Sequence, residues 1–165
     1  MKEIKTIMAA IMLAGAVSGA ASAQDAFMPD VIKWGASAAE MEAALEGKCA
    51  NGFVNRSIDS PFLPNNPAKQ VQIDCDGFDF MDAPRWVEFV IGDDRLQMVW
   101  VMVEAEDKAA AIQALKDAYG APSHNTPMFV AFTQNRAAWR EDPPEFLFYG
   151  EELDEPMRNW FDNPQ

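Results

Sequence analysis

The chain of 165 residues is poor in histidine, cysteine and positive charge, and each shortage excludes a class of function. One His and two Cys cannot complete a four-ligand structural zinc site unless carboxylates fill in. Thirteen Lys and Arg stand against 26 Asp and Glu, which gives a formal net charge of −13. Nucleic acid and anionic membranes are bound through basic surfaces, so neither is expected as a partner.

Several catalytic and cofactor motifs are also missing. The sequence has no Gly-rich phosphate loop, no H-E-x-x-H helix, no dinucleotide fingerprint and no nucleophile elbow, so we expect no cofactor. Hydrophobic residues make up 49% of the chain, which is enough for a real core and excludes wholesale disorder.

The longest apolar run is short and lies near the N-terminus. Lys2 and Lys5 precede an apolar stretch over residues 7–17, and Ala21-Ser22-Ala23 is a small-residue cleavage site. This pattern predicts a secretory signal peptide over residues 1–23. About 11 apolar residues are too few for a spanning helix, which needs about 20. The protein is therefore expected to be periplasmic or secreted.

The cleavage site defines the mature chain. Cleavage after Ala23 makes Gln24 the mature N-terminus, and residues 24–165 are expected to form a single domain. A lipid anchor is not expected, because Ala16 stands where a bacterial lipid-attachment box needs Cys.

Export changes what the two cysteines mean. Cys49 and Cys75 are the only candidates for pairing, and cysteines in an oxidising compartment normally pair. Their spacing does not resemble the C-x-x-C of thiol oxidoreductases. We therefore predict a structural disulfide and remove both residues from the list of nucleophiles.

Hydrophobic periodicity predicts two main helices and several strands. Ser37 and Glu40 form a capping box that begins a helix ending near Gly47. A second helix is predicted over residues 106–119, followed by Gly120. Strands are expected near 53–58 and over 70–80, 85–91, 95–103, 128–133, 137–140 and 145–149, with a last helical turn around 157–161. The strands 85–91 and 95–103 are predicted to form a hairpin around Gly92-Asp93-Asp94.

The order of these elements is helix, strands, helix, strands. Consecutive strands joined by short turns pair antiparallel, which predicts an α+β fold with both main helices packed on one face of the sheet. The halves 30–103 and 104–165 each read as a helix followed by strands, which indicates an internal duplication.

A resemblance accompanies this pattern. The run 92–96 leading into a strand, the helical segments 37–46 and 106–115, and Tyr119-Gly120-Ala121-Pro122 resemble small exported α+β modules. These are the β-lactamase-inhibitor-protein-like and outer-membrane-assembly-lipoprotein-like folds. The resemblance implies one helix on a curved antiparallel sheet as a unit, sometimes repeated in tandem, and it assigns no functional residue.

Polar candidates for chemistry are few. His124 lies in a polar loop beside Ser123, and a solvated loop histidine is favoured over a triad member. Asp74, Asp76 and Asp79 are the densest carboxylates, but their spacing does not match a calcium loop, so a solvated turn is favoured over a metal site.

The aromatic residues provide the functional hypothesis. If Trp86, Trp100, Trp139 and Phe148 lie on a sheet face without helices, they form a surface for a protein partner. The leading hypothesis is therefore a non-enzymatic periplasmic binding protein that uses an open sheet face. The alternative is a small-molecule or metal-ion binding module with a pocket between sheet and helices, and a carboxylate hydrolase ranks third.

Overall fold

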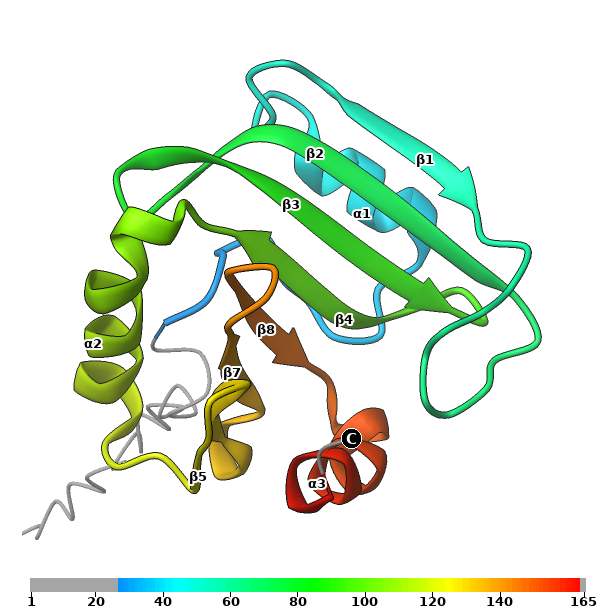
Figure 1. Cartoon of the computed structure of the whole chain (residues 1–165). Coiled ribbons are helices and arrows are strands. Elements are labelled where there is room, and N and C mark those ends of the chain that lie inside the picture. Colours follow the sequence, from blue (N-terminus) through cyan, green and yellow to red (C-terminus); the bar gives the residue numbers. More distant parts are fainter. Residues whose placement is uncertain (1–26, 164–165) are drawn as a thin grey trace, which may run out of the picture.

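Eight antiparallel strands form one sheet in the computed structural model, which describes residues 27–163 (Figure 1). The predicted signal peptide and its cleavage site lie outside the described residues. The helices are α1 Ala38–Leu45, α2 Lys108–Tyr119 and α3 Asp154–Asp162. The strands are β1 Phe53–Ser57, β2 Gln70–Phe80, β3 Ala83–Gly92, β4 Arg95–Met102, β5 His124–Asn125, β6 Phe129–Phe132, β7 Ala137–Arg140 and β8 Glu145–Tyr149.

The strand order is β1-β2-β3-β4-β8-β7-β6-β5, so β4 and β8 meet in the middle of the sheet. Each half of the chain contributes a helix followed by a four-stranded meander. The predicted α+β class with antiparallel pairing is therefore confirmed. The order is also what a duplication would give, while the duplication itself stays a prediction.

The capping box at the start of α1 forms as the sequence predicts. The Ser37 hydroxyl accepts from the Glu40 amide at 3.3 Å, and the Glu40 carboxylate accepts from the Ser37 amide at 2.8 Å. The Glu40 carboxylate also accepts from the Ser37 hydroxyl at 2.9 Å, and its hydrogen bonds from the Ser37 amide and hydroxyl lower the pKa of the Glu40 carboxyl. Met41 and Leu45 then face the sheet, and Gly47 takes a φ of +72° just past the helix.

A tight turn connects the long central strands β3 and β4. Asp93 and Asp94 take positive φ between β3 and β4, which fits the predicted hairpin at this point. Both carboxylates also bind neighbouring backbone: Asp94 accepts from the Ala38 amide at 3.1 Å, and Asp93 accepts from the Lys69 amide at 3.0 Å. The β3–β4 turn therefore fixes the entry to α1 and the entry to β2.

The two faces of the sheet are covered differently. One face carries the larger hydrophobic cluster, to which α1 contributes Met41 and Leu45 and α2 contributes Ala111 and Leu115. We call it the covered face. Figure 1 shows α1 lying along β2 and α2 standing beside the end of the strands.

The opposite face is only partly covered. Here α3 packs Met157 and Phe161 over β6–β8, and the segment between β1 and β2 inserts Leu63 against β3 and β4. The sequence predicted only a helical turn near residues 157–161, so the two-helix expectation is corrected by a third helix on this second face. We call the uncovered remainder the open face. No helix of the described residues is long and apolar enough to cross a membrane.

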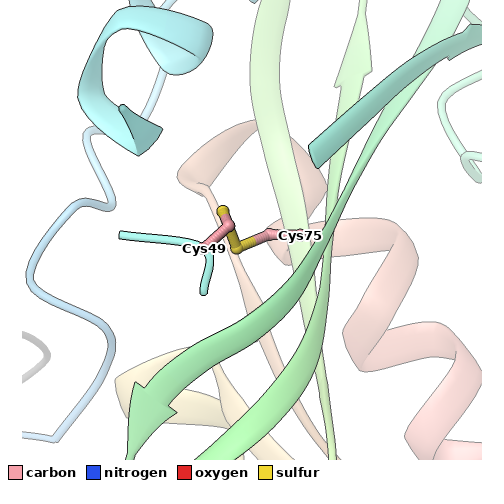
Figure 2. Close-up of a disulfide and its surroundings, with 2 residues drawn as sticks. All are labelled: Cys49 and Cys75. Atoms are coloured by element: carbon pink, nitrogen blue, oxygen red, sulfur yellow. A yellow bond between two sulfur atoms is a disulfide. The ribbon is translucent and has the colours of Figure 1, made fainter. Parts of the chain in front are cut away.

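The predicted disulfide between Cys49 and Cys75 is present and joins the segment after α1 to β2 (Figure 2). Cys75 is fully buried on the covered face. Next to it, Gly77 forms a bulge with a φ of +78°, and a Cβ there would lie 2.9 Å from the Cβ of Ala50. The bridge and the bulge together hold the edge of the sheet against α1.

Candidate functional site

The strand register brings charged and aromatic side chains into one row on the open face. Val54, Asp74, Glu88 and Trp100 are consecutive cross-strand partners from β1 to β4. Directly opposed residues of an antiparallel sheet point to the same side, so this row is continuous. Val54 is 63% exposed, which shows that the row reaches solvent at the sheet edge.

The floor of the open face contains a cavity of about 410 Å³, which we call the carboxylate cavity. Its lining combines charged, aromatic and polar side chains from six strands and two connecting segments. They are Arg56, Phe62, Gln72, Glu88, Trp100, Met102, Arg140, Pro143 and Glu145.

An apolar groove of about 200 Å³ adjoins the carboxylate cavity and shares three of its residues. The groove lies between β4, α3 and the β1–β2 segment. It is lined by Phe62, Pro64, Met98, Trp100, Arg140, Met157 and Trp160. The open face therefore places an apolar surface directly beside a charged one.

Glu145 is the most unusual residue of the carboxylate cavity. It is fully buried at the start of β8, and its Oε1 forms an ion pair with the Arg140 guanidinium. Its Oε2 is also buried and accepts no hydrogen bond from any residue that the structure describes. Burial raises the pKa of Glu145 to about 7, with Arg140 opposing the shift and Glu88 adding to it.

Arg140 connects the charged and the aromatic parts of the site. Its guanidinium carbon lies 4.4 Å from the centroid of the Trp100 ring, while the same group pairs with Glu145. A guanidinium over an indole face is a favourable cation–π arrangement. Arg140 and Trp100 therefore hold each other in place at the boundary between cavity and groove.

The remaining carboxylates come from β2 and β3. The Trp86 indole N–H donates to Glu88 Oε1 at 3.3 Å, while burial raises the pKa of Glu88 and Asp74 adds to the shift. Asp74 Oδ2 pairs with Arg56 Nε at 2.9 Å, and Asp74 Oδ1 accepts from the side-chain amide (Nε2) of Gln72 at 2.7 Å. Both carboxylate oxygens of Asp74 are thus occupied by side chains of this chain.

Phe62 is positioned by the side chain of a strand residue. The backbone amides of Phe62 and Leu63 both donate to Gln70 Oε1 at 3.0 Å. Leu63 is buried, whereas Phe62 is 51% exposed and lines both the cavity and the groove. This hydrogen-bonded anchor keeps an aromatic ring on the surface at the mouth of the site.

The four aromatic residues predicted to bind a partner divide between the two faces. Trp86, 42% exposed, and the partly exposed Trp100 lie on the open face. Trp139 and Phe148 are buried on the covered face, and Trp139 packs edge-on against Phe146 at 5.7 Å. The expectation that these two lie on an open face is wrong, because their positions in β7 and β8 point them towards the helices.

Sequence reasoning missed Phe62, Glu88, Arg140, Glu145 and Trp160. One signal was present: Glu88 interrupts the apolar part of β3, and Glu145 directly precedes the apolar residues of β8, each at a position on the open face. A carboxylate in such a strand either pairs or serves a site.

The histidine is not a free loop residue. His124 Nε2 lies 2.9 Å from Asp162 Oδ1, and His124 Nδ1 lies 3.0 Å from the Ser123 hydroxyl. The Ser123 hydroxyl also contacts the Ala131 carbonyl and the Thr133 hydroxyl and amide. Because Ser123 ties β5 to β6 in this way, we assign the chain of contacts to holding the sheet edge against α3.

The three Asp metal candidates are not brought together as a ligand set. Within residues 27–163, no group of three or more His, Cys, Asp or Glu side chains could hold a metal ion. Asp74 and Asp76 lie on one side of the Gly77 bulge and Asp79 on the other.

Comparison of the chain with protein-family models, curated proteins and solved structures finds no match in any of the three. The resemblance to β-lactamase-inhibitor-protein-like and assembly-lipoprotein-like modules therefore stays a prediction.

Proposed function

We propose that this chain is a non-enzymatic, exported binding protein that engages a protein partner through the open face. The observation that carries the proposal is the joint presence of exposed Trp86 and Phe62, the apolar groove and the carboxylate cavity on one uncovered surface. Aromatic anchors beside charged groups are typical of interface centres.

Charge favours a partner with a basic surface. The chain carries a formal net charge of −13, and the open face adds Glu88 and Asp74 to this field. Such a field steers a basic protein towards the site and repels anionic polymers. The Cys49–Cys75 disulfide fits an oxidising compartment and so supports export to the periplasm or medium.

Site-specific photo-crosslinking in the producing cell tests the proposal. A photoreactive amino acid in place of Val54, at the edge of the open face, should crosslink to a partner protein. The same amino acid in place of Met128, exposed in the β5–β6 turn, is the matched control. We expect the Val54 crosslink to disappear when Trp86→Ala is added. Equal crosslinking at both positions, or none at Val54, would reject a protein partner at this face.

A small-molecule binding module is the second candidate, because the carboxylate cavity lies between strands and the 61–64 segment and has a volume of about 410 Å³. A small ligand in the cavity would contact Glu145 and Trp100, but it would produce no crosslink between Val54 and another protein. The crosslinking experiment therefore separates the two candidates.

A further inference from the structure

The carboxylate cavity contains one acceptor that no described residue satisfies. Glu145 is fully buried, its Oε1 is taken by Arg140, and its Oε2 receives no hydrogen bond from residues 27–163. Buried carboxylate oxygens are normally hydrogen-bonded, since leaving one without a donor is costly. The cavity lies directly beside this carboxyl group, because Glu145 is one of its lining residues, and the neighbouring side chains that cover Oε2 must move for a donor to reach it.

The balance of charged side chains around the cavity indicates that this donor carries a positive charge. Three carboxylates, Asp74, Glu88 and Glu145, meet only two guanidinium groups, Arg56 and Arg140. Arg56 pairs with Asp74 and Arg140 with Glu145, whereas no ion pair of the described residues includes Glu88. One additional cation would balance the cluster and would lie between Glu88 and Glu145.

The walls of the cavity identify the shape of the incoming group. Trp100, Met102 and Phe62 provide apolar surface above the carboxylates. A lysine side chain matches this profile, because its methylene stem packs on apolar walls while its ammonium reaches polar groups. A second guanidinium matches less well: the available acceptor is the single oxygen Oε2, and a guanidinium is suited to a bidentate carboxylate.

We propose that the carboxylate cavity takes one lysine side chain of the partner protein, whose ammonium donates to Glu145 Oε2 and pairs with Glu88. An adjacent apolar side chain of the partner then occupies the groove beside Trp100 and Trp160. This proposal rests on the proposed function, because it assigns the lysine to a protein that docks on the open face.

Three capped peptides test the lysine directly: acetylated leucyl-lysyl-leucine amide and its norleucyl and arginyl counterparts. Each is titrated into the mature protein at about pH 8, where Glu145 is ionised, while the indole N–H signals are followed by NMR. Trp86 and Trp100 should shift with the lysyl peptide, and buried Trp139 should not. We expect the lysyl peptide to bind about tenfold more tightly than the norleucyl peptide.

Charge-neutral variants locate the effect. Glu145→Gln should remove the preference for lysine over norleucine, and Glu88→Gln should reduce it, whereas Glu106→Gln, exposed before α2, should leave it unchanged. Glu88→Gln also keeps the test valid if Glu145→Gln does not fold. Equal binding of the lysyl and norleucyl peptides, or arginyl binding as tight as lysyl, overturns the proposal.

The peptide and crosslinking results fail in different ways. Crosslinks at Val54 without a lysine preference would leave the proposed function standing and overturn the lysine site. A lysine preference without crosslinks would reject the protein partner and reassign the cavity to a small amine, which also overturns this proposal.

Discussion

The two faces of the same sheet differ in how they use alternate residues of each strand. In β8, Phe146 and Phe148 point to the covered face and pack among other aromatic rings, whereas Glu145 points to the open face. In β3, Val87 is buried on the covered face and Glu88 lies in the cavity. The side-chain period of two therefore places the aromatic core on the covered face and the carboxylates of the cavity on the open face, where we propose that a partner binds.

The largest expected difference between the faces is in tryptophan truncation. Trp139→Ala empties a fully buried site against Phe146 and should lower the free energy of unfolding by about 3–5 kcal/mol. Trp86→Ala removes a ring that is 42% exposed and should cost about 1 kcal/mol or less. Urea denaturation of both variants measures this difference. Similar losses in the free energy of unfolding would contradict the assignment of Trp139 to the core and Trp86 to the surface.

The disulfide should stabilise the covered face by a somewhat smaller amount. Replacing both Cys49 and Cys75 with Ala removes a bridge across a separation of 26 residues. The chain-entropy model gives such a bridge about 3 kcal/mol, measured as a shift in the urea midpoint. The lysyl peptide should bind the variant as before, provided the measurement is made below the new midpoint.

Glu145 should make the open face sensitive to pH. Its pKa is about 7 in the folded protein against an ordinary value of 4.5, so between these pH values the folded state holds a proton that the unfolded state has lost. The contribution of Glu145 to stability is therefore fully present below about pH 4.5 and is lost as pH rises towards 7. The loss amounts to at most about 3 kcal/mol.

The variant Glu145→Gln isolates the pH-dependent contribution of Glu145 to the free energy of unfolding. The free energy of unfolding of the variant relative to the natural chain should rise between about pH 5 and 8, as measured by denaturation at each pH. Glu141→Gln is the control, because hydrogen bonds from Lys108 and Trp139 lower the pKa of Glu141 and keep it ionised over this range. A difference in the free energy of unfolding that does not change with pH would contradict the raised pKa of Glu145.

The smallest predicted effect concerns the cap of α1. Ser37→Ala removes the hydroxyl that accepts from the Glu40 amide and should cost about 1 kcal/mol in thermal or urea denaturation. Because α1 covers the opposite face, peptide binding at the carboxylate cavity should not change. A weakened peptide response would mean that the two faces are coupled through the sheet.

Local patterns in the sequence were sufficient for the parts of the fold that local chemistry determines. The capping box at Ser37, the turn at Asp93 and Asp94, and the pairing of Cys49 with Cys75 are all confirmed. Between β2 and β3 the sequence predicted a break between the strands 70–80 and 85–91 but not a tight hairpin turn, because Met81 and Asp82 take positive φ without the Gly or Asn that normally indicates such a turn.

The candidate site was harder to predict because it depends on tertiary placement. Trp139 and Trp100 look alike in the sequence, and only the strand register separates a core ring from a surface ring. Phe62 lies in an irregular segment whose position is set by hydrogen bonds to Gln70, which no local pattern predicts. The acidic residues from Glu151 onwards form a short helical turn that leads into α3, and no apolar periodicity in the sequence indicates the start of this helix.

The central pairing of β4 with β8 has a consequence for synthesis. β4 ends at Met102, but its partner β8 begins only at Glu145. During synthesis, the edge of β4 that will pair with β8 therefore has no hydrogen-bonding partner until β8 has been made. An apolar strand with a free edge is prone to associate with other chains. A protein truncated before β8 should therefore aggregate rather than persist as a half-sized fold, and the newly made chain would need shielding until its last strand emerges.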